Sequence, residues 1–209
     1  MKHIEEMLDF LYKSPSCFHA VDEIKNHLNK AGYEQLDESQ KWKIHAGGKY
    51  FVMRNHSSII ALDLPENPVR GYRIMASHSD SPCFKIKENP EIVVEDKYVK
   101  LNVENYGGMI YSSWYDRPLS VAGRIICDDG SGGLTERLVN IDRDLLIIPN
   151  LAIHMDREVN TGYKYNPQKD LQPIYGTIAS KGRFMEEVAE AAETKADAIL
   201  GHDLFLYQR

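Results

Sequence analysis

The motif at the centre of this sequence is GYRIMASHSDSPCFKIK, residues 71–87. Its first part, 72–76, is a short apolar run with aromatic and β-branched members, which predicts a buried strand. The polar cluster 77–81 follows, and Pro82 ends it. Residues 84–87 then alternate between apolar and charged side chains, which predicts a second, half-exposed strand.

The polar cluster contains two residue types that zinc sites use, His78 and Asp80. Two residues apart at the end of a strand, their side chains would lie on one side of the backbone, because extended side chains repeat with period two. The imidazole could bind a metal through one ring nitrogen while the carboxylate orients the other. An ordinary surface histidine would show the same spacing, so both interpretations stay open. The same pattern recurs at His154 and Asp156, after the apolar run 151–153.

Composition excludes several classes of protein. The chain has 209 residues, 43% of them apolar and 27% charged, which is typical of one sizeable globular domain or two small ones. A formal net charge of −6 argues against a surface that binds nucleic acid. No segment approaches the roughly 20 apolar residues that span a bilayer, and the N-terminus lacks the pattern of a signal peptide. Three widely spaced cysteines argue against a disulfide framework, so we expect a cytoplasmic protein without nucleic-acid or membrane partners.

The first part of the chain shows helical and then strand periodicity. Two helices followed by three strands are predicted, at residues 4–11, 18–28, 42–44, 49–54 and 58–62. We expect the apolar stripes of both helices to pack in the core, Gly32 to stop the second helix, and His19 to be solvated or to cap that helix. This order of elements predicts an α/β layer arrangement with a site at the carboxyl edge of the sheet.

Beyond residue 87 the pattern becomes mostly β. Two hairpins and two further strands are predicted, at residues 92–95 with 98–101, 119–127 with 134–140, 145–148 and 174–179. The polar stretch 160–172 is expected to be a loop. Helical periodicity returns at 180–195 and is followed by a strand that reaches Tyr207. We therefore predict three segments, 1–89, a mostly-β unit at 90–180, and a return to the first domain at 181–209.

Six segments, in order along the chain, resemble the M18 metallopeptidases, the aspartyl aminopeptidase family. Residues 76–82, ASHSDSP, are similar to the family signature His-Thr-Asp-Ser-Pro, with Ser79 in place of Thr. Residues 14–21, SPSCFHAV, resemble its Ser-Pro-Thr-Pro-Phe-His-Ala-Val, with Cys17 in place of the second Pro. The other matching segments are GGKYF at 47–51, YGG followed by WYDRPL within 106–119, LAIH at 151–154 and HDLFLY at 202–207.

The resemblance implies a zinc aminopeptidase that removes N-terminal, usually acidic, residues from peptides. His78 would be a zinc ligand, and Asp80 would be the catalytic-site residue that orients it. His154 would reach into the active site of a neighbouring subunit and contact substrate there. The implied fold is an α/β peptidase sheet with helices, interrupted by an inserted mostly-β dimerisation domain. The implied assembly is a homo-oligomer, a dimer that in the full-length family builds a tetrahedral dodecamer.

Length is the main departure from the family. The chain resembles roughly the first half of such an enzyme, so the peptidase sheet is expected to be incomplete. The family's complete site holds two zinc ions, about 3.5–4 Å apart, that activate water, and a Glu moves the water's proton. The remaining ligands and this Glu have no counterpart here, so we expect the chain alone to be inactive. Exposed apolar surface is expected where the missing half would pack, with Phe205 and Tyr207 as candidates.

Two other functions compete with this interpretation. The first is a non-catalytic oligomerisation or regulatory module derived from such an enzyme. The second is a mononuclear zinc hydrolase that uses His78, Asp80 and His154, although the sequence offers it no general base.

Overall fold

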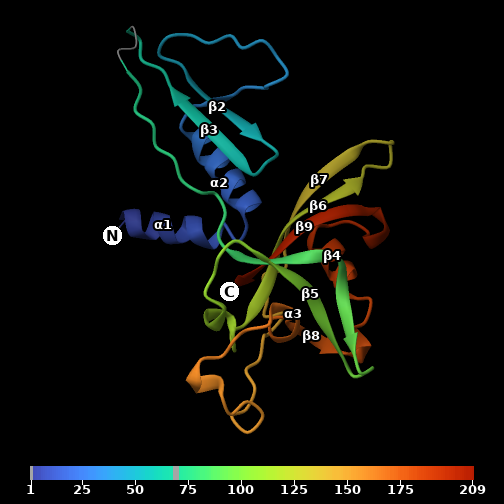
Figure 1. The fold of residues 1–209 in the computed structure, drawn as a ribbon. Helices are drawn as coiled ribbons and strands as arrows, with labels where there is room; N and C mark the ends of the chain where they lie inside the picture. The colour runs from blue at the N-terminus through green and yellow to red at the C-terminus, as the bar shows by residue number, and fades with distance from the viewer. Residues whose placement is uncertain (1, 68–70) are drawn as a thin grey trace. The chain divides into compact units, whose positions relative to one another are not determined.

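The computed structural model describes residues 2–67 and 71–209 and divides into two compact units, Met1–Ser81 and Pro82–Arg209. Figure 1 shows the elements of each unit. Within the described residues, no helix is both long enough and apolar enough to cross a membrane.

The first unit combines two helices with a small sheet. Its elements are α1 Lys2–Tyr12, α2 Cys17–Lys30, β1 Glu34–Gln35, β2 Lys49–Arg54 and β3 Ser58–Asp63. The sheet order is β1-β2-β3, with β2 antiparallel to β3. The turn between them places Asn55 and His56 at positive φ, the left-handed conformation that tight hairpin turns require. Phe18 and Val21 of α2 and Phe51 of β2 are buried. The helix at 18–28 and the strands at 49–54 and 58–62 are therefore confirmed.

Several predictions for this unit are wrong. Helix α1 forms, but its stripe is not core, because Ile4, Met7, Leu8 and Leu11 are 53–59% exposed. Residues 72–76 do not form a strand: Tyr72, Ile74 and Met75 are 83%, 86% and 99% exposed. Residues 42–44 also lie outside any strand. An inner strand needs hydrogen-bonding neighbours, and in the part of the chain that the structure describes no strand pairs with 71–81.

The second unit is built on a six-stranded sheet of order β7-β6-β9-β4-β5-β8, antiparallel throughout. The strands are β4 Cys83–Val94, β5 Tyr98–Tyr106, β6 Leu119–Asp128, β7 Leu134–Asn140, β8 Ile174–Thr177 and β9 Ile199–Gln208. Its helices are α3 Pro167–Asp170 and α4 Phe184–Ala191, with 3-10 turns η1 Tyr111–Trp114, η2 Val159–Thr161, η3 Ile178–Ser180 and η4 Ala196–Ala198. Both predicted hairpins are confirmed. The predicted helix at 180–195 is shorter, and 145–148 makes only isolated bridges.

The position of β9 bears on the predicted segments. It lies between β6 and β4, so residues 199–208 belong to the same sheet as the hairpins. The structure thus divides at 81–82, whereas the sequence predicted boundaries at 89–90 and 180–181. The assignment of 1–89 and 181–209 to a peptidase domain stays a prediction.

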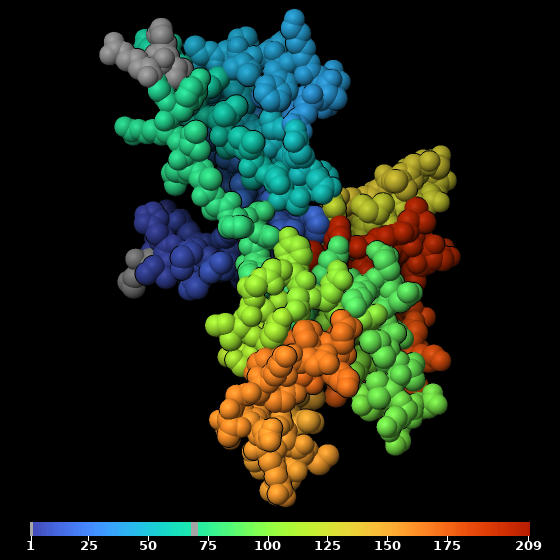
Figure 2. Space-filling model, viewed as in Figure 1, coloured from blue at the N-terminus to red at the C-terminus, as the bar shows by residue number. Residues whose placement is uncertain are grey.

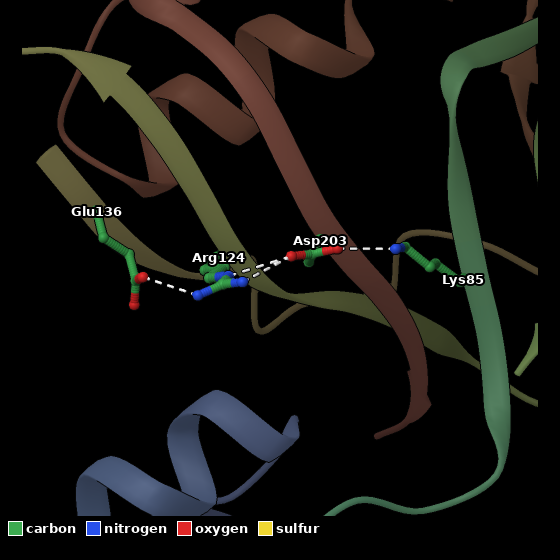
Figure 3. A network of polar contacts seen from close by, with 4 residues as sticks. All are labelled: Lys85, Arg124, Glu136 and Asp203. Carbon is green, nitrogen blue, oxygen red and sulfur yellow. Dashed lines mark hydrogen bonds and ion pairs between the residues drawn. The ribbon is translucent and has the colours of Figure 1, made fainter. Parts of the chain in front are cut away.

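A chain of ion pairs joins four strands of this sheet (Figure 3). Asp203 on β9 accepts from Lys85 Nζ on β4 at 2.7 Å, and from Nε and Nη2 of Arg124 on β6 at 3.1 and 3.0 Å. Arg124 Nη1 donates to Glu136 Oε2 on β7 at 2.9 Å. Partial burial raises the pKa of Asp203, but the hydrogen bonds from Lys85 and Arg124 outweigh it, and the net shift is downward. Asp203 is therefore a stable anion that links its neighbours on both sides.

Strands β6 and β9 approach closely at Gly123. A Cβ at this position would lie 2.0 Å from the carbonyl oxygen of Asp203 and 2.9 Å from Leu204 Cα. Both atoms belong to backbone that the sheet hydrogen bonds hold in place. Only glycine fits between the two strands at this point.

We predict that Gly123→Ala lowers the free energy of unfolding of the second unit by about 2–4 kcal/mol, because β9 must move away from β6. Urea denaturation would measure the change. Gly201→Ala is the matched control on β9, since no heavy atom lies within 4 Å of the point that its Cβ would occupy, and it should change stability by less than about 0.5 kcal/mol. Equal effects of the two substitutions would contradict the close approach.

A second prediction concerns His19, which is partly buried and not fully solvated as expected. Its Nδ1 lies 2.8 Å from Ser16 Oγ, and burial lowers the pKa of His19 to about 4. Below about pH 6.5, the His19 imidazole therefore binds a proton in the unfolded chain but stays neutral in the folded chain. We expect the first unit to lose on the order of 2 kcal/mol of stability between about pH 6.5 and 5. Denaturation of His19→Gln should lack this component, and an unchanged pH dependence in that variant would refute it.

Candidate functional site

The signature segment brings His78 and Asp80 together. Nδ1 of His78 lies 3.1 Å from Oδ1 of Asp80, and the imidazole side chain is 92% exposed while the carboxylate is 34% exposed. With Nδ1 directed at the carboxylate, Nε2 is left facing outward for a ligand or metal. The predicted pairing is present, but a loop produces it and not the end of a strand.

A hydroxyl ties this loop to the sheet of the first unit. Ser79 Oγ donates to the backbone carbonyl of Ser57 at 2.8 Å. Ser57 lies in the turn between β2 and β3, so the residue between His78 and Asp80 is anchored to a hairpin. Sequence reasoning missed this contact. The signal was available, because the family signature carries Thr at this position, and Thr and Ser share the hydroxyl that makes the bond.

The donor set fits zinc only in part. Even an open catalytic zinc site needs three protein ligands. Among residues 2–67 and 71–209, no group of three His, Cys, Asp or Glu side chains comes close enough to hold a metal ion. His78 can supply one ligand and Asp80 can orient it. The alternative mononuclear site that also uses His154 stays a hypothesis, because His154 belongs to the other unit.

His154 lies in the second unit, on the segment between the bridge residue Ile148 and α3. The segment, orange in Figure 2, forms a lobe that projects from the rest of this unit. The side chain of His154 is exposed. An exposed histidine on a projecting lobe is accessible to another molecule, and its predicted contact with substrate in a neighbouring subunit stays a prediction.

The base of this lobe is rich in tyrosine. The ring of Tyr165 lies 5.0 Å from that of Tyr163, 5.6 Å from Tyr111 and 5.9 Å from Tyr115, measured between centroids. Burial raises the pKa of Tyr115, so its phenol keeps its proton. Sequence reasoning expected residues 160–172 to be a loop rich in polar residues and tyrosine, but α3 lies within this stretch. The signal for this cluster was the pair of tyrosines two residues apart at 163 and 165.

Comparison with protein families agrees with the signature. The model of the family described as aminopeptidase I zinc metalloprotease (M18) matches residues 10–208. A probable M18 family aminopeptidase 2 of Clostridium acetobutylicum is 46% identical over 215 residues, covering 100% of this chain and 50% of the relative. Its counterpart in Ectopseudomonas mendocina is 40% identical, covering 98% and 49%. The chain thus spans about half the length of these relatives.

Solved structures show the same fold of mixed α and β content. Chaetomium thermophilum mApe1 superposes with a TM-score of 0.88 at 32% identity, covering 98% of this chain and 50% of that one. A chain from the complex of Ape4 and Nbr1 gives a TM-score of 0.92 at 32% identity, with coverage of 97% and 43%. The S. cerevisiae mApe1 dodecamer gives 0.77 at 25% identity, with coverage of 98% and 47%. By its sequence and its structure alike, this chain belongs to the M18 family of aminopeptidases.

Proposed function

We propose that this chain forms part of a zinc-dependent aminopeptidase that removes N-terminal, preferentially acidic, residues from peptides. The observation that carries the proposal is the 3.1 Å contact between His78 Nδ1 and Asp80 Oδ1 inside the M18 signature. A carboxylate on one imidazole nitrogen is the arrangement that orients a zinc-binding histidine.

The roles of the two residues follow from this geometry. His78 would hold zinc through Nε2, and Asp80 would accept a hydrogen bond from Nδ1–H, which fixes the tautomer and makes Nε2 a better ligand. When bound, zinc polarises the scissile carbonyl and activates water for attack. We expect the other ligands of the two-zinc site and the general base from the half of the relatives' length that this chain does not span. Alone, the chain would then be inactive.

The second unit would supply subunit contacts. We propose that residues 90–180, which include β5 to β8, are a mostly-β dimerisation domain inserted into the peptidase domain, and that His154 contacts substrate in the neighbouring subunit. The projecting lobe supports a contact made outside the unit. The dodecameric state of the S. cerevisiae relative supports a homo-oligomer. We place the enzyme in the cytoplasm, consistent with three cysteines that form no disulfide.

A chimera in which residues 1–209 replace the matching half of the Clostridium acetobutylicum relative would test the roles of His78 and Asp80. We predict that Asp80→Ala lowers kcat about 10–100-fold, the usual cost of losing such an orienting partner. His78→Ala should lower it further and reduce the zinc content measured by atomic absorption. The control His45→Ala, in an exposed turn, should leave both values unchanged.

Retained activity and zinc in His78→Ala would refute the proposed metal ligand. Two measurements separate the alternatives. Tight one-to-one zinc binding by the 209-residue chain, abolished by His78→Ala, would favour the mononuclear hydrolase. A native protein of only this size, purified from its source, would favour the regulatory module, whereas one about twice as long would favour the enzyme.

The exposed apolar surface leads to a further prediction. Phe205 does not provide it: β9 is an interior strand, Phe205 is 7% exposed, and its ring lies 5.3 Å from Tyr106. Tyr207 is half-buried and donates to Asn140 Oδ1 at 2.8 Å. Exposed apolar side chains occur in both units, and those of the first unit include the α1 stripe and Tyr72, Ile74 and Met75.

We expect the 209-residue chain to self-associate at about 10 µM and above, because these side chains are open to water. Analytical ultracentrifugation would measure it. Replacing Tyr72, Ile74 and Met75 together by Ser should weaken the association without changing the circular dichroism, since none of the three is packed. A monomer at that concentration would contradict the prediction.

A further inference from the structure

Two consecutive residues, Tyr115 and Asp116, bond to opposite ends of the segment that carries His154. At the first end, Asp116 Oδ1 accepts from the backbone nitrogen of Asn150 at 2.9 Å, and Oδ2 accepts from Asn150 Nδ2 at 2.8 Å. At the other end, the Tyr115 hydroxyl donates to the carbonyl oxygen of Asp170 at 3.3 Å. Both ends of the segment 150–170 are therefore held by the adjacent residues Tyr115 and Asp116.

The backbone of Asp116 fits this task. Its φ is +54°, in the left-handed region that Asp and Asn adopt more readily than other side chains. Its own nitrogen donates to Ile148 at 2.9 Å, and Tyr115 bridges to the same residue. The hydrogen bonds from Asn150 hold the pKa of Asp116 below its usual value, so the side chain is a carboxylate that accepts at both oxygens.

Inside the segment, local bonds are few near His154. Met155 and Asp156 donate to the carbonyl of Ala152 at 2.7 and 3.3 Å, which makes one turn around the histidine. This turn starts two residues after Asn150. Its direction therefore depends on how Asn150 is held, since a short tether leaves little freedom between the two points.

We propose that Asp116, with Tyr115, is a positioning residue that clasps the base of this segment and sets the direction in which His154 is presented. The inference rests on the proposed function of His154 as a substrate contact and extends it to the residues that aim it. Asp116 acts through Asn150 and touches no substrate itself.

The hydrogen bonds of the clasp can be broken by one substitution and restored by swapping the side chains of Asp116 and Asn150. Asn150→Asp places two carboxylates face to face, and the bond between the side chains is lost. Adding Asp116→Asn restores it, because the new amide donates to the new carboxylate while its oxygen still accepts from the backbone of residue 150. The left-handed φ is compatible with Asn as well as Asp. Asn89→Asp is the matched control, the same exchange at an exposed site on β4 of the same unit.

Hydrogen exchange of the 209-residue chain, followed by mass spectrometry, tests the clasp. We expect the amides of 151–166 to exchange at least 5-fold faster in Asn150→Asp and to return to within 2-fold of the original rate in the double variant. The control should leave this segment unchanged. Equal exchange in Asn150→Asp and the unchanged chain, or a double variant as fast as the single one, would overturn the clasp.

Steady-state kinetics of the chimera described above test whether the clasp positions His154 for its proposed contact with substrate. We expect Asn150→Asp to lower kcat about 5-fold or more and the double variant to recover it. Once His154 is replaced by Ala, adding Asn150→Asp should lower kcat no further. If His154→Ala lowers kcat and Asn150→Asp does not, the clasp does not aim His154. If His154→Ala itself leaves kcat unchanged, the proposed role of His154 is wrong. The hydrogen-exchange rates of residues 151–166 still decide whether the clasp exists.

Discussion

The close pairing of β9 with β6 is the constraint on which the second unit depends. The backbone of Asp203 lies where a side chain at residue 123 would be, so the two strands can meet only at a glycine. Once β9 is in place, the Asp203 side chain pairs with Lys85 on one neighbouring strand and Arg124 on the other. One residue thus contributes its carbonyl oxygen to the packing and its carboxylate to the register of the sheet. Without β9, β4 would have no partner on that side.

This arrangement explains how distant parts of the chain come to form one sheet. Strand β4 begins one residue after Pro82, and β9 lies more than a hundred positions later. Their pairing encloses the hairpins between them, and with those hairpins the turn at Tyr115 and Asp116 and the lobe at 150–170. The proposed presentation of His154 therefore depends on the sheet that β9 completes by pairing with both β4 and β6.

In the first unit, by contrast, the proposed zinc-site residues lie on a loop outside the sheet. His78 and Asp80 lie in a loop that is anchored to the β2–β3 hairpin through Ser79. The apolar residues before this loop are almost fully exposed. The His78–Asp80 pair therefore lies on a loop and not at the edge of a sheet.

Prediction from sequence succeeded where the deciding interactions are local. The hairpins at 92–101 and 119–140 and the helix at 18–28 follow from alternation, turn residues and helical spacing within one short segment. The pairing of His78 with Asp80 is also local, because two residues two positions apart can meet in a loop as well as in a strand. Predictions failed where a neighbour was assumed. The strand at 72–76, the buried face of α1 and the exposed Phe205 each depended on which other segment packs beside them.

The family, the local elements and the His-x-Asp pair could all be read from the order of amino acids, because each resides in a short run of residues. Three-dimensional packing was needed to show that β9 belongs to the same sheet as the hairpins, that Ser79 anchors the signature to Ser57, and that Asp116 bonds to Asn150. These contacts join residues 22 to more than 100 positions apart along the chain. Chain closure over such distances follows from the packing of the whole unit, and no pattern in a single segment encodes it.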